Sequence, residues 1–162
     1  MARTWSAPPV VAASAGSLIR DPSGRLLILK PTYKSGWTLP GGVMEADGET
    51  PWDACRREVR EETGLTVSAG RLVCVDTRPA KPGRLLGLRF LFACEVDDAD
   101  VRGAIRLQAS EIERHRFVRE RTALDLLRPA VRRRVRSVLD DPGRCRYLED
   151  GRPVDDVPGP PG

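Results

Sequence analysis

Residues 37–65 read W-T-L-P-G-G-V-M-E-A-D-G-E-T-P-W-D-A-C-R-R-E-V-R-E-E-T-G-L, and this stretch decides the fold. It predicts a strand end, a glycine turn, a short acidic loop and then a helix rich in carboxylates. Thr50, which is followed by a proline, is a typical N-cap, and Asp53 completes a capping box. Gly64 supplies the positive φ that is common just after a helix. The helix is therefore expected over residues 51–63.

The faces of this helix follow from a rotation of about 100° per residue. Three carboxylates then share one arc of about 100°: Glu58, Glu61 and Glu62. The neighbouring arc carries Trp52, Cys55 and Val59, which predicts the buried stripe. Like charges on one arc repel, and a hard cation relieves the repulsion because such cations prefer carboxylate oxygens. For an arbitrary helix of this pattern, a solvated acidic face with arginine partners is the alternative.

The spacing around the helix resembles the Nudix box, G-x5-E-x7-R-E-U-x-E-E-x-G-U, in which U is a bulky aliphatic residue. The matching positions are Glu49, Arg57, Glu58, Val59, Glu61, Glu62, Gly64 and Leu65. One departure exists, because six residues rather than five separate Gly42 from Glu49. The extra residue falls in a loop, where length changes cost little. The resemblance implies an α/β fold, namely a Nudix-type α/β/α sandwich around a mixed β-sheet.

Composition places the chain among single-domain proteins. Its 162 residues suffice for one sizeable core, and its net charge of +4 favours anionic partners. The four cysteines are scattered and form no C-x-x-C motif, which argues against a zinc knuckle and favours a cytoplasmic location. No apolar run approaches the ~18 residues of a membrane span. The signal-peptidase-like residues 13–15 lack a preceding apolar stretch, so we do not expect secretion.

Three segments are expected along the chain: a flexible lead at residues 1–9, a single domain at 10–149 and a disordered Pro/Gly-rich tail at 150–162. The expected strands are Val10–Ile19, Arg25–Lys30, Thr66–Val67, Arg71–Thr77, Leu85–Val96 and Ile112–Val118. We expect the first two strands to form a hairpin. A second helix should run from about Thr122 to Leu139, with Pro129 breaking or kinking it. At most, Arg146–Leu148 pairs with Pro153–Val154 around an Asp-Gly turn.

The resemblance also implies the chemistry of the site. A diphosphate ester carries dense negative charge, which bound Mg²⁺ screens while it lowers the pKa of a water. Nudix relatives would hold Mg²⁺, or Mn²⁺ as a substitute, through Glu58, Glu61 and Glu62, with the main-chain carbonyl of Gly42 as a further ligand. Arg57 would orient the glutamates through ion pairs. Glu49 stays open between supporting these groups and taking a direct part.

The general base and the substrate contacts lie outside the helix. Candidate bases are Asp47, Glu111, Glu113 and Glu120, of which Glu111 has the best local context; a turn or an ion pair is its alternative role. Tyr33, in an exposed loop, is the candidate for stacking on a nucleobase. Arg78 and Arg84, in a loop stiffened by prolines, are candidates for phosphate contacts. A solvated loop is the alternative for both arginines.

We therefore expect a Mg²⁺-dependent hydrolase that cleaves the diphosphate linkage of a nucleoside diphosphate joined to another moiety, or a modified nucleoside triphosphate. A non-hydrolytic nucleotide sensor and an RNA 5′-end pyrophosphohydrolase are the alternatives. An isoprenoid diphosphate isomerase would need a histidine-rich metal site, and the chain has one histidine. The basic run at residues 131–136 is expected in the C-terminal part of the second helix, where cations suit the helix dipole, so nucleic acid binding is not expected. A homodimer stays open.

Overall fold

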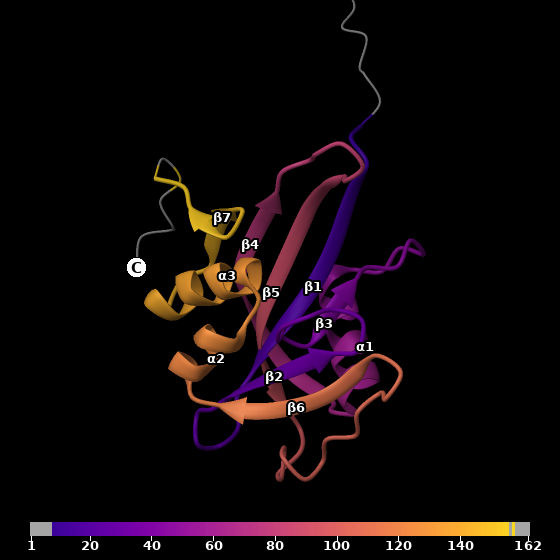
Figure 1. Cartoon of the computed structure of the whole chain (residues 1–162), viewed down its shortest axis with the longest axis vertical. Coiled ribbons are helices and arrows are strands. Elements are labelled where there is room, and N and C mark those ends of the chain that lie inside the picture. Colours follow the sequence, from indigo (N-terminus) through magenta and orange to yellow (C-terminus); the bar gives the residue numbers. More distant parts are fainter. Residues whose placement is uncertain (1–7, 156, 158–162) are drawn as a thin grey trace, which may run out of the picture.

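The computed structural model describes residues 8–155 and 157, and Figure 1 shows a long central sheet with helices on both of its faces. The elements are β1 (Val11–Ile19), β2 (Leu26–Pro31), β3 (Gly41–Val43), α1 (Pro51–Thr63), β4 (Val67–Arg78), β5 (Leu86–Val96), β6 (Ile112–Val118), α2 (Glu120–Leu126), α3 (Pro129–Asp140), β7 (Arg146–Glu149) and β8 (Arg152–Pro153). The expected α/β/α sandwich around a mixed sheet is confirmed. No helix in the described part of the chain is long and apolar enough to cross a membrane.

The main sheet has six strands in the order β3-β1-β5-β4-β7-β8, so β5 lies in its interior, as its long apolar run predicts. β1 runs parallel to β5, and β4 runs parallel to β7, whereas the other neighbours are antiparallel. β4 is one strand through two register shifts, although the sequence predicted two separate pieces. Backbone pairing therefore continues through Ala69 and Gly70, which lie between the two predicted pieces.

The predicted hairpin of the first two strands is wrong. β2 pairs with β6 in a separate two-stranded sheet, and only an isolated bridge between Arg20 and Leu26 joins its start to the end of β1. The physical reason is burial, because Leu26, Leu27, Ile28 and Leu29 are all fully buried. Such a strand needs apolar cover on both faces, which an edge hairpin next to the solvent does not offer.

Two hydrophobic clusters fill the layers on either side of the main sheet. One cluster joins Cys55 and Val59 of α1 to alternate residues of β1 and β5. The other joins Val135 of α3 to Leu91 of β5 on the opposite face. β2 supplies Leu27 and Leu29 to the first cluster, and Leu26 and Ile28 to the second. The two-residue side-chain period of a strand thus lets one short segment support both layers.

Pro129 breaks the second helix into α2 and α3, as the sequence allowed. Arg128, which precedes the proline, has an extended backbone, in keeping with the steric limits on that position. The basic run at residues 131–136 consequently lies in the first part of α3, so its predicted place in the C-terminal part of a helix is wrong. Its arginines have local partners instead: Arg132 Nη2, for example, donates to the carbonyls of Asp125 and Leu127 at 3.1 Å, at the end of α2.

Strand pairing continues beyond residue 149, as the sequence allowed for Arg146–Leu148 and Pro153–Val154 around an Asp-Gly turn. β7 and β8 pair around a turn at Asp150–Gly151, where both residues have positive φ. Gly151 is buried, and its N–H donates to Asp76 Oδ1 at 2.8 Å. Buried backbone needs such a partner, and Asp76 supplies it across the sheet. Residues 1–7, 156 and 158–162 of the expected lead and tail lie outside the described residues.

The buried side chain of Asp21, in the turn after β1, binds Arg102 in the long connection between β5 and β6. Burial would raise the pKa of Asp21, but hydrogen bonds from Ser23, the Arg25 N–H and Arg102 outweigh it and hold that pKa well below its usual range. Asp21 Oδ1 accepts the N–H groups of Ser23 and Arg25, both at 2.9 Å, and Oδ2 accepts Arg102 Nε at 2.7 Å. The charged form is therefore stabilised in the folded protein.

Asp21→Asn is expected to lower the free energy of unfolding by about 2 kcal/mol at pH 7, because buried donors lose a charged acceptor. A lowered acid pKa stabilises the fold above the ordinary value of 3.8. The difference between the two proteins should therefore shrink as pH falls through 3.8 and below. Urea unfolding of both proteins at a series of pH values measures this difference.

Glu120→Gln is the control, because it removes an exposed ion pair with Arg20 and should lower the free energy of unfolding by less than ~1 kcal/mol. An equal loss of stability in Asp21→Asn and Glu120→Gln would contradict the stabilising role of Asp21.

Candidate active site

The acidic helix α1 begins and ends as the sequence predicts. Thr50 has an extended backbone, and its Oγ1 accepts the Asp53 N–H at 3.1 Å. Thr50 Oγ1 also donates to Asp53 Oδ2 at 2.8 Å. At the other end, Gly64 has φ 74° and donates to the Arg60 carbonyl. These caps fix the rotation of the helix, and with it the direction of its carboxylates.

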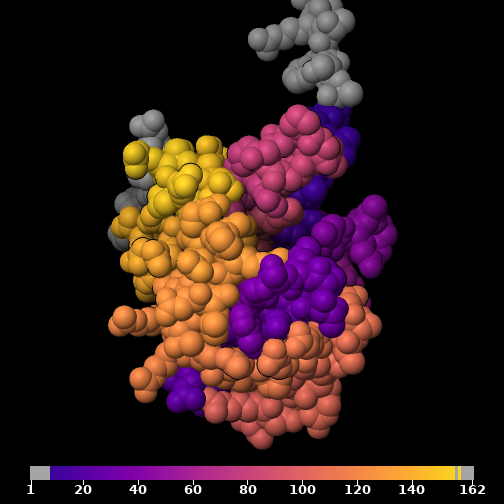
Figure 2. All heavy atoms as spheres, viewed as in Figure 1, coloured from indigo at the N-terminus to yellow at the C-terminus, as the bar shows by residue number. Residues whose placement is uncertain are grey.

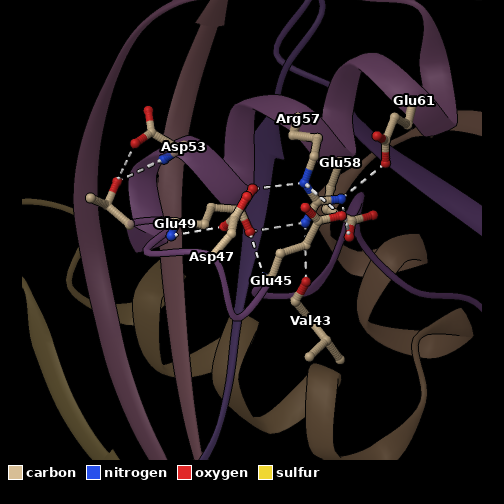
Figure 3. A network of polar contacts seen from close by, with 9 residues as sticks. Val43, Glu45, Asp47, Glu49, Asp53, Arg57, Glu58 and Glu61 are labelled. Atoms are coloured by element: carbon tan, nitrogen blue, oxygen red, sulfur yellow. Dashed lines mark hydrogen bonds and ion pairs between the residues drawn. The ribbon is translucent and has the colours of Figure 1, made fainter.

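Arg57 is the centre of the polar network drawn in Figure 3. Its guanidinium binds Glu49 through two atoms, Nε at 2.7 Å and Nη2 at 3.1 Å. Nη1 donates to Glu58 Oε1 at 2.9 Å and to Glu61 Oε2 at 3.0 Å. Nη2 also reaches the Val43 carbonyl at 3.1 Å. One planar cation thus ties the loop before the helix, the β3 strand and two helical carboxylates together.

Glu49 binds Arg57 despite the extra loop residue that precedes it. Glu49 is largely buried, and hydrogen bonds from Arg57 and the Glu45 N–H lower the pKa of its carboxyl. The Glu45 N–H donates to Glu49 Oε2 at 2.7 Å, and the Glu49 N–H donates to Asp47 Oδ1 at 3.2 Å. With both oxygens bound to Arg57, Glu49 serves to hold that arginine. Asp47 closes the loop, which argues against it as a base.

Glu58 lies against the glycine turn. A Cβ atom on Gly42 would lie 2.5 Å from Glu58 Cδ and closer still to Oε1, so only glycine leaves room for this carboxylate. Burial raises the pKa of Glu58, Arg57 opposes this, and the nearby charges of Glu61 and Glu111 raise it further. The side chain is 13% exposed. A largely buried carboxylate with acidic neighbours is well suited to a cation.

Glu62 is the most buried carboxylate of the helix, at 4% exposure, and it accepts the Gly41 N–H through Oε2 at 2.8 Å. Burial raises the pKa of Glu62 to about 8, against the Gly41 hydrogen bond and together with the charges of Glu58, Glu111 and Glu61. The sequence placed this residue on an acidic arc but gave no sign of its burial. A buried carboxylate with unfavourable neighbours is a common feature of functional sites.

Glu111 lies at the same site although it is far from Glu62 in the sequence. Its charge raises the pKa of both Glu58 and Glu62. Backbone hydrogen bonds explain its position: the Gln108 N–H donates to the Glu62 carbonyl at 3.3 Å, and the Glu111 carbonyl accepts the Thr32 N–H at 2.8 Å. The short turn at residues 108–111 therefore bridges α1 and the end of β2.

Two other candidate bases are occupied elsewhere. Glu113 pairs with Lys30 at 3.4 Å and with Arg114 at 3.0 Å, whereas Glu120 pairs with Arg20 at 2.7 Å. Of the four candidates, Glu111 is therefore the one that the fold brings to the glutamates without a strong partner.

Tyr33 is exposed, in the loop that follows β2. Burial of its hydroxyl is the largest cause of its raised pKa, followed by the charges of Glu62 and Glu111, with Arg128 acting in the opposite direction. Arg128 is a residue that sequence reasoning missed. Its N–H donates to the Trp37 carbonyl at 3.0 Å, and its Nε is buried with no partner among the described residues. In the sequence, its place before Pro129 was the one feature that could have drawn attention to Arg128.

The donor set fits a divalent cation. In the described part of the chain, no three acidic, histidine or cysteine side chains converge into a preformed cage. Instead Arg57 Nη1 lies between Glu58 and Glu61, and Glu62 turns toward Gly41. The space that a Gly42 side chain would fill adjoins Glu58. Carboxylate and carbonyl oxygens match the ligand preferences of Mg²⁺ and Mn²⁺.

Arg78 and Arg84 flank the loop between β4 and β5, at the other end of the sheet from the acidic turn of residues 108–111 (Figure 1). Arg84 Nη2 donates to the Pro79 carbonyl at 3.0 Å, and its Nε is buried with no partner in the described structure. The structure does not bring these arginines into contact with the glutamates of α1. Arg78 and Arg84 can contact a ligand bound at these glutamates only if the ligand is long.

Comparison with known proteins adds the family. Residues 11–140 match the NUDIX domain model. The chain is 40% identical over 70 residues to a MutT-like protein of Streptomyces ambofaciens, over 43% of this chain and 45% of that protein. It is 38% identical over 52 residues to an RNA pyrophosphohydrolase of Halorhodospira halophila, over 32% of this chain and 28% of that protein. The chain thus spans less than half the length of these curated relatives.

Among solved structures, the MutT protein of Methanosarcina mazei Go1 superposes with a TM-score of 0.66 and 26% identity. The superposition covers 83% of this chain and 96% of that one. The similarity extends through nearly the whole of that protein, so both the order of strands and the position of the acidic helix belong to one shared fold.

Proposed function

Because this chain belongs to the Nudix family, we propose that it is a Mg²⁺-dependent hydrolase of nucleotide diphosphate linkages. The substrate is a nucleoside diphosphate joined to another moiety, or a modified nucleoside triphosphate. One observation supports this most strongly: Arg57 binds Glu49, Glu58 and Glu61 at once beside the turn at Gly41–Gly42. A solvated acidic face would not need an arginine that binds three carboxylates at once, with Glu49 only 9% exposed.

Each residue has a proposed part. Glu58 and Glu62 hold the cation, with Glu61 and the Gly42 carbonyl as further oxygen donors, and Mn²⁺ can replace Mg²⁺. When bound, Mg²⁺ screens the diphosphate and makes water more acidic. Arg57 keeps the glutamates oriented.

Glu111 is the proposed general base. A water oxygen attacks one phosphorus atom, its proton passes to the Glu111 carboxylate, and the bridging P–O bond breaks. The products are a nucleoside monophosphate and the phosphorylated second moiety, or a monophosphate and pyrophosphate from a triphosphate. Tyr33, whose ring is exposed, is the proposed residue for stacking on a nucleobase.

A nucleotide panel with Mg²⁺ tests the proposal by measuring the release of phosphate, pyrophosphate or monophosphates. Glu58→Gln protein, prepared in the same way, controls for contaminating hydrolases. Turnover by the wild type that is absent from the variant supports the proposal. Binding of nucleotides without any turnover would favour a non-hydrolytic sensor instead.

A second candidate is an RNA 5′-end pyrophosphohydrolase, because one relative carries that name. An RNA oligonucleotide with a 5′-triphosphate, added to the same panel, separates the two functions. Preference for this RNA over all mononucleotides by more than tenfold in kcat/KM would favour it. The cytoplasmic location and the homodimer stay predictions.

Arg78→Ala and Arg84→Ala are expected to raise KM about three- to tenfold while changing kcat less, since the box helix cannot discriminate the group at the far end of the substrate. The ranking of substrates in the panel should change as well. An equal loss of kcat for every substrate would instead place the loop in the chemical step. Unchanged kinetics in both variants would support the solvated-loop alternative.

A further inference from the structure

Three arginines lie on the α3 face of the sheet near one buried carboxylate, and a fourth arginine lies in the adjoining β4–β5 loop. They are Arg78, Arg84, Arg89 and Arg134, here called the arginine cluster. Arg134 Nε binds Asp76 Oδ2 at 2.9 Å, and Asp76 is 1% exposed. Asp76 on β4 pairs with Arg89 on β5, and two residues further along β4, Arg78 pairs with Gly87. Residues two apart on a strand share a face, so Asp76, Arg78 and Arg89 project to the same side.

Gly87 makes room for the guanidinium of Arg89. A Cβ on Gly87 would lie 3.3 Å from both Arg89 Nη2 and Arg78 Cβ, so the Arg89 side chain lies over this glycine beside Arg78. Arg89 Nη1 donates to the Ala12 carbonyl at 3.0 Å and to the Leu88 carbonyl at 3.3 Å. The guanidinium is thereby held over β1 rather than extended into solvent.

The cluster has more positive charge than its carboxylate can balance. In the structure described here, Asp76 is the one acidic partner, and its ion pair is with Arg134. Arg84 and Arg89 bind main-chain carbonyls, which carry no net charge, and Arg84 Nε is buried without a partner. Burial lowers the pKa of Arg89, and Arg134, Arg78 and Arg84 lower it further, as expected for neighbouring cations. Like charges held together in a half-buried place favour an anion.

The cluster lies on the α3 face and α1 lies on the opposite face of the sheet, so a ligand that reaches both must pass over the edge strand β3. Ser14 on β1 pairs with Arg89 on one side and with Val43 on the other. Two strand spacings, or about 10 Å, therefore separate the backbones of Arg89 and Val43. Val43 follows Gly42 on β3, the edge strand, and Figure 2 shows the surface hollowed beneath the pink β4–β5 loop, between α3 and the purple segments.

We propose that the arginine cluster is an anion subsite, and that the preferred substrates carry a second phosphate group beyond the diphosphate that is cleaved. Guanidinium groups bind phosphate oxygens in pairs, which suits the fixed position of Arg89 and the free donors of Arg84. The choice of substrate class rests on the proposed function. The anion subsite itself does not, and it can be measured without turnover.

The first experiment titrates the full chain with inorganic phosphate in the presence of a chelator and follows the melting temperature. Chloride at equal ionic strength corrects for general screening. Phosphate should raise Tm, because it binds the folded protein. Both Arg89→Gln and Arg84→Gln should weaken the apparent phosphate affinity about tenfold, because each variant loses a charged hydrogen-bond donor. Arg136→Gln removes the same charge from an exposed position on α3 and should leave the affinity unchanged.

Equal affinities in wild type, Arg89→Gln and Arg84→Gln would overturn the subsite, and so would an equal loss in Arg136→Gln. Arg78→Gln provides a second check at a more accessible position if Arg89→Gln folds poorly. Retention of the wild-type affinity in Arg78→Gln would then count against the cluster.

The second experiment compares matched substrates that differ by one phosphate, such as NADPH and NADH, within the nucleotide panel. Arg89→Gln should reduce kcat/KM about tenfold more for the phosphorylated member of each pair. Equal reductions would overturn the assignment of a second phosphate. If the wild type cleaves nothing in the panel, the proposed hydrolase function fails, while the phosphate titration still decides the subsite.

Discussion

Glu62→Gln is expected to lower kcat about 10²- to 10³-fold at saturating Mg²⁺, the usual effect of losing one preorganised charge in an active site. Glutamine has the size of glutamate and can still accept the Gly41 N–H through its carbonyl oxygen. The variant therefore loses a negative oxygen donor and little else. Steady-state kinetics over a range of Mg²⁺ concentrations measures kcat separately from metal affinity.

The same substitution should leave the melting temperature unchanged or raise it. Glu62 is 4% exposed and lies near Glu58 and Glu111, so its ionised form is costly in the metal-free protein. Loss of activity together with retained stability is the pattern of a functional site. Glu45→Gln removes an exposed loop carboxylate 4.0 Å from Arg57 Nε and serves as control, with at most a threefold effect expected. Near-normal kcat in Glu62→Gln would refute its proposed role.

Gly42→Ala is expected to lower kcat/KM about 100-fold, because a displacement of about 1 Å in a reacting group can cost that much. The added Cβ would lie 2.5 Å from Glu58 Cδ, so the carboxylate must move. Gly42 does not have a positive φ, and no backbone atom is among the three nearest contacts of the new Cβ. The fold should therefore persist, which circular dichroism and the melting temperature can verify.

Gly143→Ala is the matched control, since its Cβ would meet nothing within 4 Å. A double-mutant cycle with Glu58→Gln sharpens the test. If Gly42 acts by leaving room for Glu58, the two losses should be strongly non-additive. Fully additive losses would contradict this explanation and assign Gly42 a separate part, such as its carbonyl oxygen as a metal ligand.

Local spacing determined the acidic helix and much of its network. A cap at Thr50, a stop at Gly64 and a 3.6-residue period fix which side chains share a face, and none of this depends on distant residues. The same periodicity places Glu61 four residues after Arg57, where their side chains meet. Family resemblance, carried by the same residues, supplied the sandwich that periodicity alone leaves as a mixed α/β fold.

Pairing between distant strands could not be read from the sequence. β1 joins β5 in parallel rather than β2 in a hairpin, because the fully buried β2 must lie between two cores. That choice depends on which faces the rest of the chain covers. Strand register alone also brings Arg89 within two strands of Val43. Where two residues are far apart in the sequence, the tertiary structure decides whether their side chains become neighbours.

Burial of charge is the other property that only the tertiary structure decided. Glu61 and Glu62 are neighbours in sequence with identical chemistry, yet the Glu61 side chain is 49% exposed and Glu62 is 4% exposed. The glycine turn at Gly41 and the bridge at residues 108–111 cover Glu62 and remove it from water. The sequence by itself determined which carboxylates the helix presents together. The packing of segments distant in sequence determined how far each one is removed from water, because desolvation depends on every atom nearby and not on helical spacing.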